Sequence, residues 1–172
     1  TMDESALQEC LVNRDYERLR DIARDLSPDE LRELFLSLEK PDFLLLFRLL
    51  LARTEDEQER KRDKILSEIL LNESPTMFLA SNPDGSIIVA SEFFIEKSGY
   101  RREEVIGKNH LALFVPPHER EEVSRKLEDL LRLGTPVQGE THLVTRGGKE
   151  ILLQWEARVA YRENGEVDFI YG

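Results

Sequence analysis

The stretch of residues 79–109, LASNPDGSIIVASEFFIEKSGYRREEVIGKN, decides the fold of this chain. Residues 82–85 have turn chemistry, because proline presets φ, aspartate bonds its own backbone and glycine accepts a positive φ. Apolar runs flank the turn, so the pattern predicts a β-hairpin. A short helix is expected next. It should end at Gly99, since glycine favours the left-handed conformation that terminates helices.

The residues after this stretch continue with helix and strand patterns. Apolar residues recur at helical spacing over residues 118–133, which predicts a long helix ending at Gly134. Three strands are predicted to follow, at residues 137–146, 150–162 and 167–171. The middle strand has an apolar face made of Leu153, Trp155, Ala157, Val159 and Tyr161. This order predicts an α+β fold, a five-stranded antiparallel sheet with helices on one face.

Short motifs in this half resemble those of the PAS domain family, and the resemblance covers about residues 68–172. The matching segments are Pro83-Asp84-Gly85, Phe94 with Ser98-Gly99-Tyr100, residues 103–109, Gly139-Glu140, Gly147-Gly148 and Gly165-Glu166. The chain departs from the family at Ser91, where an asparagine commonly begins the helix after the second strand. Serine also caps helices, so we expect the fold to be kept. The resemblance implies a sensory module of a bacterial signalling protein.

Helical patterns fill the sequence before Pro75. The clearest helix start is Ser27-Pro28-Asp29-Glu30, a capping box with proline at the first helical position. An apolar stripe follows it, made of Leu31, Leu34, Phe35 and Leu38. Two earlier helices are expected around residues 7–12 and 16–23, and another from Pro41 that is apolar nearly all round over residues 43–51. We therefore predict a small all-α domain over residues 1–53.

Residues 7–50 resemble the cytoplasmic N-domain of MgtE-type magnesium transporters, especially at residues 25–31 and 46–50. In that family the domain helps to sense Mg²⁺ through acidic residues that face a companion domain. No companion is visible in this sequence, so no metal ligands are carried over and no metal site is predicted. An unrelated small helical bundle is the alternative interpretation.

Residues 54–74 are predicted to form a connector helix, which starts at a second capping box over residues 54–57. Its first turns are almost wholly charged, whereas its end carries an apolar group that includes Ile65, Leu66, Ile69 and Leu70. In PAS proteins a helix at this place packs on the outer face of the sheet, and often on its twin in a dimer. The resemblance therefore implies that these residues dock either on the sheet of their own domain or on a second copy in a homodimer, and that a PAS domain follows over residues 75–172.

Composition narrows the class of protein. The net charge is −11, with 19 acidic and 12 basic residues before Pro75 and 16 and 12 after it. Nucleic-acid binding needs a basic face and is therefore disfavoured. Charged residues make up 34% of the chain and the apolar runs are short, so no membrane insertion is expected. The single cysteine, Cys10, excludes an internal disulfide and fits a cytoplasmic location.

The sequence also limits which of the cofactors known for PAS domains this chain could bind. Photoactive flavin members need a cysteine beside the flavin ring, and no cysteine follows Cys10, so covalent flavin photochemistry is excluded. Haem ligation is not expected, because His118 is predicted to be a solvated residue at the start of the long helix. We expect His110 and His142 to be ordinary surface histidines. The identity of any cofactor stays open.

The family's architecture and the strand alternation indicate residues that would line a ligand cavity beneath the helices: Leu79, Val89, Phe94, Leu113, Leu143, Leu153 and Trp155. A core without any cavity would need the same residues. Trp155 is the only tryptophan, and its indole N–H needs a partner. A ligand could be that partner, although plain core packing is the favoured interpretation.

Two functions follow from these observations. The first is a sensor that detects a small ligand or a partner, and transmits through the connector helix and dimer interface to an output domain beyond residue 172. The alternative is a ligand-free protein–protein interaction module. No nucleophile elbow, phosphate-binding loop or metal-ligand cluster occurs in the sequence, so no catalytic residue is predicted and the fragment is not expected to be an enzyme.

Overall fold

The computed structural model describes residues 3–39, 42, 64, 67–68, 71–72, 75–162 and 164–172. The chain divides into two compact units, Thr1–Ser74 and Pro75–Gly172. Within the described residues, no helix is both long and apolar enough to cross a membrane. The apolar helix predicted at residues 43–51, and the connector residues Ile65, Leu66, Ile69 and Leu70, lie outside the described residues.

The first unit begins with three helices, α1 (Glu4–Asn13), α2 (Tyr16–Arg24) and α3 (Pro28–Ser37). The predicted capping box is present at the start of α3. The Glu30 N–H donates to Ser27 Oγ at 3.3 Å, and the Ser27 N–H donates to Glu30 Oε2 at 2.9 Å. The buried apolar residues of these helices are Leu7, Cys10, Leu19, Ala23, Leu31 and Leu34. Val12, the last residue of the first helix predicted from the sequence, is 72% exposed.

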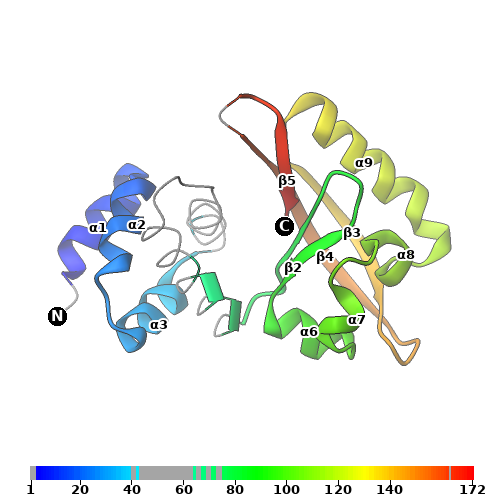
Figure 1. The fold of residues 1–172 in the computed structure, drawn as a ribbon, viewed down its shortest axis with the longest axis horizontal. Coiled ribbons are helices and arrows are strands. Elements are labelled where there is room, and N and C mark those ends of the chain that lie inside the picture. The colour runs from blue at the N-terminus through cyan, green and yellow to red at the C-terminus, as the bar shows by residue number, and fades with distance from the viewer. Residues whose placement is uncertain are drawn as a thin grey trace. The chain divides into compact units, whose positions relative to one another are not determined.

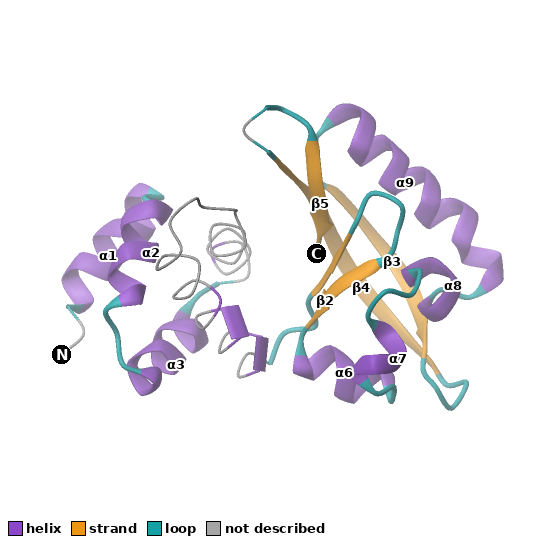
Figure 2. Cartoon of the chain, in the orientation of Figure 1, coloured by secondary structure: helices purple, strands orange, loops and turns teal. Residues whose placement is uncertain are grey.

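The second unit is built on a five-stranded antiparallel sheet with the strand order β2-β1-β5-β4-β3. The strands are β1 (Leu79–Ser81), β2 (Ile87–Ala90), β3 (Val137–Val144), β4 (Glu150–Tyr161) and β5 (Val167–Tyr171). The helices are α6 (Glu92–Ser98), α7 (Arg102–Val105), α8 (His110–Phe114) and α9 (Arg120–Leu133), with a 3₁₀ turn, η1 (Pro117–Glu119), before α9. Helices α6 to α9 lie over one face of the sheet (Figures 1 and 2). The predicted fold class is confirmed.

The hairpin and the helix after it form for the local reasons seen in the sequence. Gly85 has φ +91° and its N–H donates to the carbonyl of Asn82 at 2.9 Å. The Asp84 carboxylate accepts from the Ser86 N–H at 2.9 Å, which closes the turn. Helix α6 ends at Gly99, whose φ of +75° no β-branched residue would adopt without strain.

The outer edge of β2 is closed by the loop at residues 107–109. The Gly107 N–H donates to the Ile87 carbonyl at 2.7 Å, and the Ile87 N–H donates to the Lys108 carbonyl at 2.9 Å. Ser86 and Asn109 form an isolated bridge beside them. The backbone of β2 is therefore paired on both sides at Ile87, where the strand begins, and β3 is the sheet's other edge.

A bulge in β2 changes which side chains face the helices. Ala80 pairs with Val89 but Ser81 pairs with Ile87, so Ile88 is an extra residue with no partner on β1. Extra residues of this kind break the alternation of a strand. As a result Ile87 and Ala90 both reach the helix-covered core, while Ile88 is 39% exposed.

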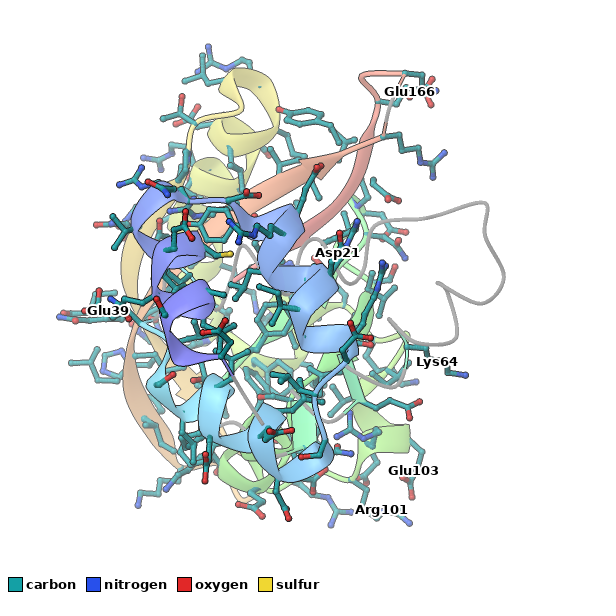
Figure 3. The ribbon with its side chains drawn as sticks, turned by 90° about the vertical axis from the view of Figure 1, so that its left-hand side faces the viewer. Asp21, Glu39, Lys64, Arg101, Glu103 and Glu166 are labelled. Atoms are coloured by element: carbon teal, nitrogen blue, oxygen red, sulfur yellow. The ribbon has the colours of Figure 1, made fainter. Side chains whose placement is uncertain are left out.

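Charged side chains cover the surface of both units. Asp21 and Glu39 project from the first unit, and Arg101 and Glu166 from the second (Figure 3).

Tyr161, predicted on the apolar face of β4, is 43% exposed. It lies beside Gly134, where α9 has already ended, so no helix covers it fully.

Candidate functional site

The space beneath α6, α7 and α8 is filled by an apolar cluster, which we call the first core cluster. Its buried members are Ile87, Ala90, Phe94, Ile95, Val105, Phe114 and Leu143. Two aromatic contacts centre on Phe114. The Phe94 ring lies edge-on to it with centroids 4.9 Å apart, and the Tyr100 ring does the same at 5.7 Å. Edge-to-face contacts of this kind stabilise a core beyond simple burial of area.

The space beneath α9 holds the second core cluster, whose buried members are Leu130, Ala157, Val159 and Ile170. Leu127, Leu131, Val137, Trp155 and Val167 pack against it and are partly buried. Leu130 is fully buried and comes from the helix, while the other buried members come from β4 and β5. The cluster therefore depends on α9 staying against the sheet.

Trp155 lies on the helix-covered face of β4, directly over Gly139 of the paired strand β3. A Cβ atom placed on Gly139 would be 2.6 Å from Cε2 of the indole and 3.0 Å from its Nε1. The Lys126 ammonium of α9 lies 5.8 Å from the centroid of the indole ring. A cation at this distance from an aromatic ring is attracted to it. Gly139 and Lys126 thus fix the position of the only tryptophan.

The structure brings most of the candidate lining residues together. Phe94 and Leu143 are buried members of the first core cluster, and Leu79, Leu113 and Leu153 pack against it. Trp155 belongs to the second cluster instead. Whether these residues line a ligand cavity stays a prediction.

Val89 lies elsewhere. It is paired with Ala80, which in turn pairs with Tyr171, so Val89 is on the sheet face opposite the helices. The simple alternation that predicted an inward Val89 is wrong, because the bulge at Ile88 shifts the strand by one residue.

That opposite face of the sheet is also apolar over β1, β2, β5 and the last part of β4. We call it the outer apolar patch, and it consists of Ala80, Val89, Ala160, Phe169 and Tyr171. The Phe169 and Tyr171 rings are 5.8 Å apart between centroids, and Phe78 lies 6.5 Å from Tyr171. A sheet face meant for water carries alternating polar residues instead. No pattern in the sequence marks Phe169 and Tyr171 beyond their place in the last predicted strand.

Ser91 does more than cap α6. Its Oγ accepts from the Phe94 N–H at 3.2 Å and from the Phe78 N–H at 2.9 Å, and donates to the Thr76 carbonyl at 2.7 Å. Ser91 is only 1% exposed. It therefore ties the start of α6 to the segment that enters the domain, a role the capping signal alone could not reveal.

The three histidines have different environments. His118 is exposed, as predicted. His110 is partly buried beside Gly85, and burial lowers its pKa below the ordinary value. The prediction of ordinary surface histidines is therefore wrong for His110.

His142 is only partly exposed, because Glu119 contacts both its ring and its backbone. Its Nδ1 lies 2.5 Å from Glu119 Oε1, and its backbone N–H donates to Glu119 Oε2 at 2.8 Å. The hydrogen bond that the Glu119 carboxylate accepts from the imidazole raises the pKa of His142, and the same bond lowers the pKa of Glu119. The prediction of an ordinary surface histidine fails here too, because the partner is 23 residues away in the sequence. Among the described residues, no group of three or more His, Cys, Asp or Glu side chains could hold a metal ion.

Solved structures resemble this fold. The PAS domain of an HTR-like protein from Haloarcula marismortui matches with a TM-score of 0.54 at 23% identity, covering 67% of this chain and 95% of that one. The PAS-B domain of Drosophila melanogaster Cycle with bound ethylene glycol matches with a TM-score of 0.52 at 13% identity, covering 56% of this chain and 94% of that one. At these identities the likeness concerns the fold alone.

Relatives are also found by sequence. The biofilm dispersion protein BdlA of Pseudomonas aeruginosa is 36% identical over 73 residues, which are 42% of this chain and 18% of BdlA. Phototropin-1A of Oryza sativa subsp. japonica is 30% identical over 90 residues, which are 52% of this chain and 10% of that protein. This chain thus matches a small part of each relative. The sequence profile of the PAS domain matches residues 74–171. This chain therefore belongs to the PAS domain family.

Proposed function

We propose that the chain is the sensory part of a cytoplasmic signalling protein, in which the PAS domain detects a small ligand or a partner. PAS domains are generally sensory modules, and residues 74–171 are one. The finer proposal is that a change in the core reaches the connector helix, a homodimer interface and an output domain beyond residue 172. Residues 1–172 are proposed to have no enzymatic activity of their own.

The observation that carries this proposal is a sheet with apolar residues on both faces. One face packs under α6 to α9, and the other carries the outer apolar patch. The two faces share the strands β1 and β5, since neighbouring residues such as Ile170 and Tyr171 point to opposite sides. A change in the core that shifts β1 or β5 therefore also alters the outer apolar patch, on which the apolar end of the connector helix could dock.

Ligand binding is tested by native mass spectrometry of the purified chain. We expect the native protein to be heavier than the denatured one by the mass of a small molecule. Leu153→Trp, which enlarges a side chain packed against the first core cluster, should abolish this excess mass. Leu152→Trp is the matched control, because Leu152 is the adjacent residue and is 56% exposed. Equal native and denatured masses for the wild-type chain would refute the small-ligand form of the proposal.

A second function is favoured by the tight aromatic packing around Phe114, where the Phe94 and Tyr100 rings lie 4.9 Å and 5.7 Å away. Rings in such contact leave less room for a ligand, as in a ligand-free interaction module. The same mass measurement separates the two functions. A wild-type chain without bound molecule that still captures a second copy supports the interaction module.

Transmission through the connector is tested by changing its apolar end. We expect the wild-type chain to be a dimer by size-exclusion chromatography with light scattering, and Ile65→Glu with Ile69→Glu to make it a monomer. Burying two carboxylates in an apolar contact is strongly unfavourable. Lys64→Glu is the control, because Lys64 is an exposed residue of the same segment. A wild-type chain that is monomeric at high concentration would remove the dimer from the proposal.

The helical unit is proposed to be similar to the N-domain of MgtE-type magnesium transporters, with no Mg²⁺ ligand assigned. Its contribution to the signal is tested by thermal denaturation in millimolar MgCl₂, with KCl at equal ionic strength as the control. Magnesium sensing requires a specific rise in the melting temperature. Equal melting in both salts excludes it.

A further inference from the structure

One carboxylate joins the start of α9 to the edge strand β3. Both oxygens of Glu119 are engaged by His142, Oε1 by the ring Nδ1 at 2.5 Å and Oε2 by the backbone N–H at 2.8 Å. The Glu119 side chain is 20% exposed and that of His142 is 38% exposed, so water reaches the pair only in part. Glu119 is the residue that precedes α9, and His142 lies in β3.

We propose that Glu119 and His142 form a pH-sensitive latch, which holds the start of α9 against β3 while the imidazole is protonated and weakens when the imidazole loses its proton. An imidazolium donates a charge-assisted hydrogen bond to a carboxylate. A neutral imidazole still donates from Nδ1 in one tautomer, but without the charge, and such bonds are weaker. The hydrogen bond from the His142 backbone depends on the same carboxylate remaining in place.

The neighbouring charges favour the protonated imidazole. From the η1 turn, Glu119 is the direct partner; the exposed His118, whose Nε2 lies 3.7 Å from Glu119 Oε1, is the neighbouring group that brings no negative charge. From the strands, Glu140 of β3 and Glu150 of β4 add negative charge. The pKa of His142 is raised above 6.5, first by its hydrogen bond to the Glu119 carboxylate, while burial opposes the rise.

The pH range of the latch follows from the directions in which the pKa values of His142 and Glu119 are shifted. The pKa of His142 is raised by folding, so its contribution to stability is complete below 6.5 and is lost as pH rises through the raised value. The pKa of Glu119 is lowered from 4.5, so its contribution is present above 4.5 and is lost as pH falls through the lowered value. The latch is therefore strongest between about 4.5 and 6.5 and loosens in the neutral to alkaline range.

The latch affects the core because it holds the start of α9, and α9 contributes a central core residue. Helix α9 supplies Leu130, the fully buried centre of the second core cluster. Loosening the start of the helix lowers the free energy needed for α9 to move away from the sheet. This inference does not depend on a ligand, a dimer or an output domain, so it can hold even if the proposed function fails.

The test is a pH titration of the full chain by NMR, following the imidazole signals and hydrogen exchange of the His142 amide. We expect His142 to titrate above 6.5 in the wild type and closer to 6.5 in Glu119→Gln. Amide protection at His142, corrected for the intrinsic rate, should fall about tenfold in Glu119→Gln at pH 6. In the wild type the protection should decrease as pH rises past the titration of His142.

Two control variants separate the latch from general charge effects. Glu122→Gln removes an equal charge from the exposed first turn of α9, and His118→Gln removes the neighbouring histidine. Both should leave the titration of His142 and the protection of its amide close to wild type. The latch is refuted if His142 titrates at its ordinary value in the wild type, or if Glu119→Gln leaves amide protection unchanged. A loss of protection equal in Glu122→Gln would also refute it.

Discussion

Replacing Gly139 by alanine tests how tightly Trp155 is held against the sheet. The added methyl group would lie 2.6 Å from the indole Cε2, whereas ordinary van der Waals contact begins at about 3.4 Å. The indole must therefore move by at least about 0.8 Å, the difference between the two distances, because its Cζ2 atom lies closer still to the added methyl group. It cannot do so without disturbing the second core cluster and the contact with Lys126.

Two effects of opposite sign decide the size of the change. Overpacking of a filled core costs roughly 1–3 kcal/mol. Alanine has less freedom than glycine in the unfolded chain, which stabilises the folded state by about 0.4–1 kcal/mol at a compatible backbone. The φ of Gly139 is not among the positive ones, so this second effect applies in full. We expect a net loss of about 1–2 kcal/mol in the free energy of unfolding.

The assay is urea denaturation followed by the fluorescence of Trp155, which is the only tryptophan and therefore reports on the second unit alone. Gly147→Ala is the matched control, because its nearest neighbour would be Thr145 Oγ1 at 4.0 Å. We expect that variant to be as stable as the wild type or slightly more stable. A Gly139→Ala protein as stable as the wild type, with an unshifted emission maximum, would refute the reasoning.

Other expectations follow from single side chains. Ser91→Ala should cost about 2 kcal/mol, because it leaves two buried N–H groups and a carbonyl without a partner. Ser124→Ala in α9 is the control, and urea denaturation measures both. Leu130→Ala should cost about 2–5 kcal/mol by the same assay, since a fully buried side chain leaves a cavity; no loss would contradict the described core. Burial lowers the pKa of His110 from 6.5, so stability should fall as pH falls through that value. Between pH 5 and 7 the melting temperature should therefore rise less steeply with pH in His110→Gln than in the wild type. Equal slopes in the two proteins would contradict this expectation.

Local signals in the sequence were sufficient to predict the helix ends and the hairpin. The turn at Gly85, the end of α6 at Gly99 and the capping box at Ser27 each depend on residues within a few positions of one another. Such interactions are independent of the remainder of the chain. The strands were predicted for a related reason. The alternation of apolar and polar residues along β4 can be recognised within that one strand, without knowledge of its neighbours.

The misplaced residues depend on contacts that are distant in the sequence. Val89 was expected inside, but the bulge at Ile88 arises from how β2 pairs with β1. The pairing of His142 with Glu119 joins residues 23 positions apart, and no periodicity marks it. The stacking of Trp155 on Gly139 needs the register of β3 against β4. A glycine opposite a tryptophan in a predicted hairpin is the one signal that could have indicated this contact.

The closed edge of β2 limits how copies of this domain can join. Growth of a fibre by strand addition needs two open edges on every molecule, one to accept the previous copy and one to offer to the next. Here residues 107–109 already take the hydrogen bonds of Ile87 at the start of the β2 edge, and β3 forms the other edge. Joining two copies through β3 uses the same edge of both molecules and leaves nothing for a third. Edge pairing of β3 with β3 therefore ends at two copies, and the loop at residues 107–109 hinders growth from the β2 edge.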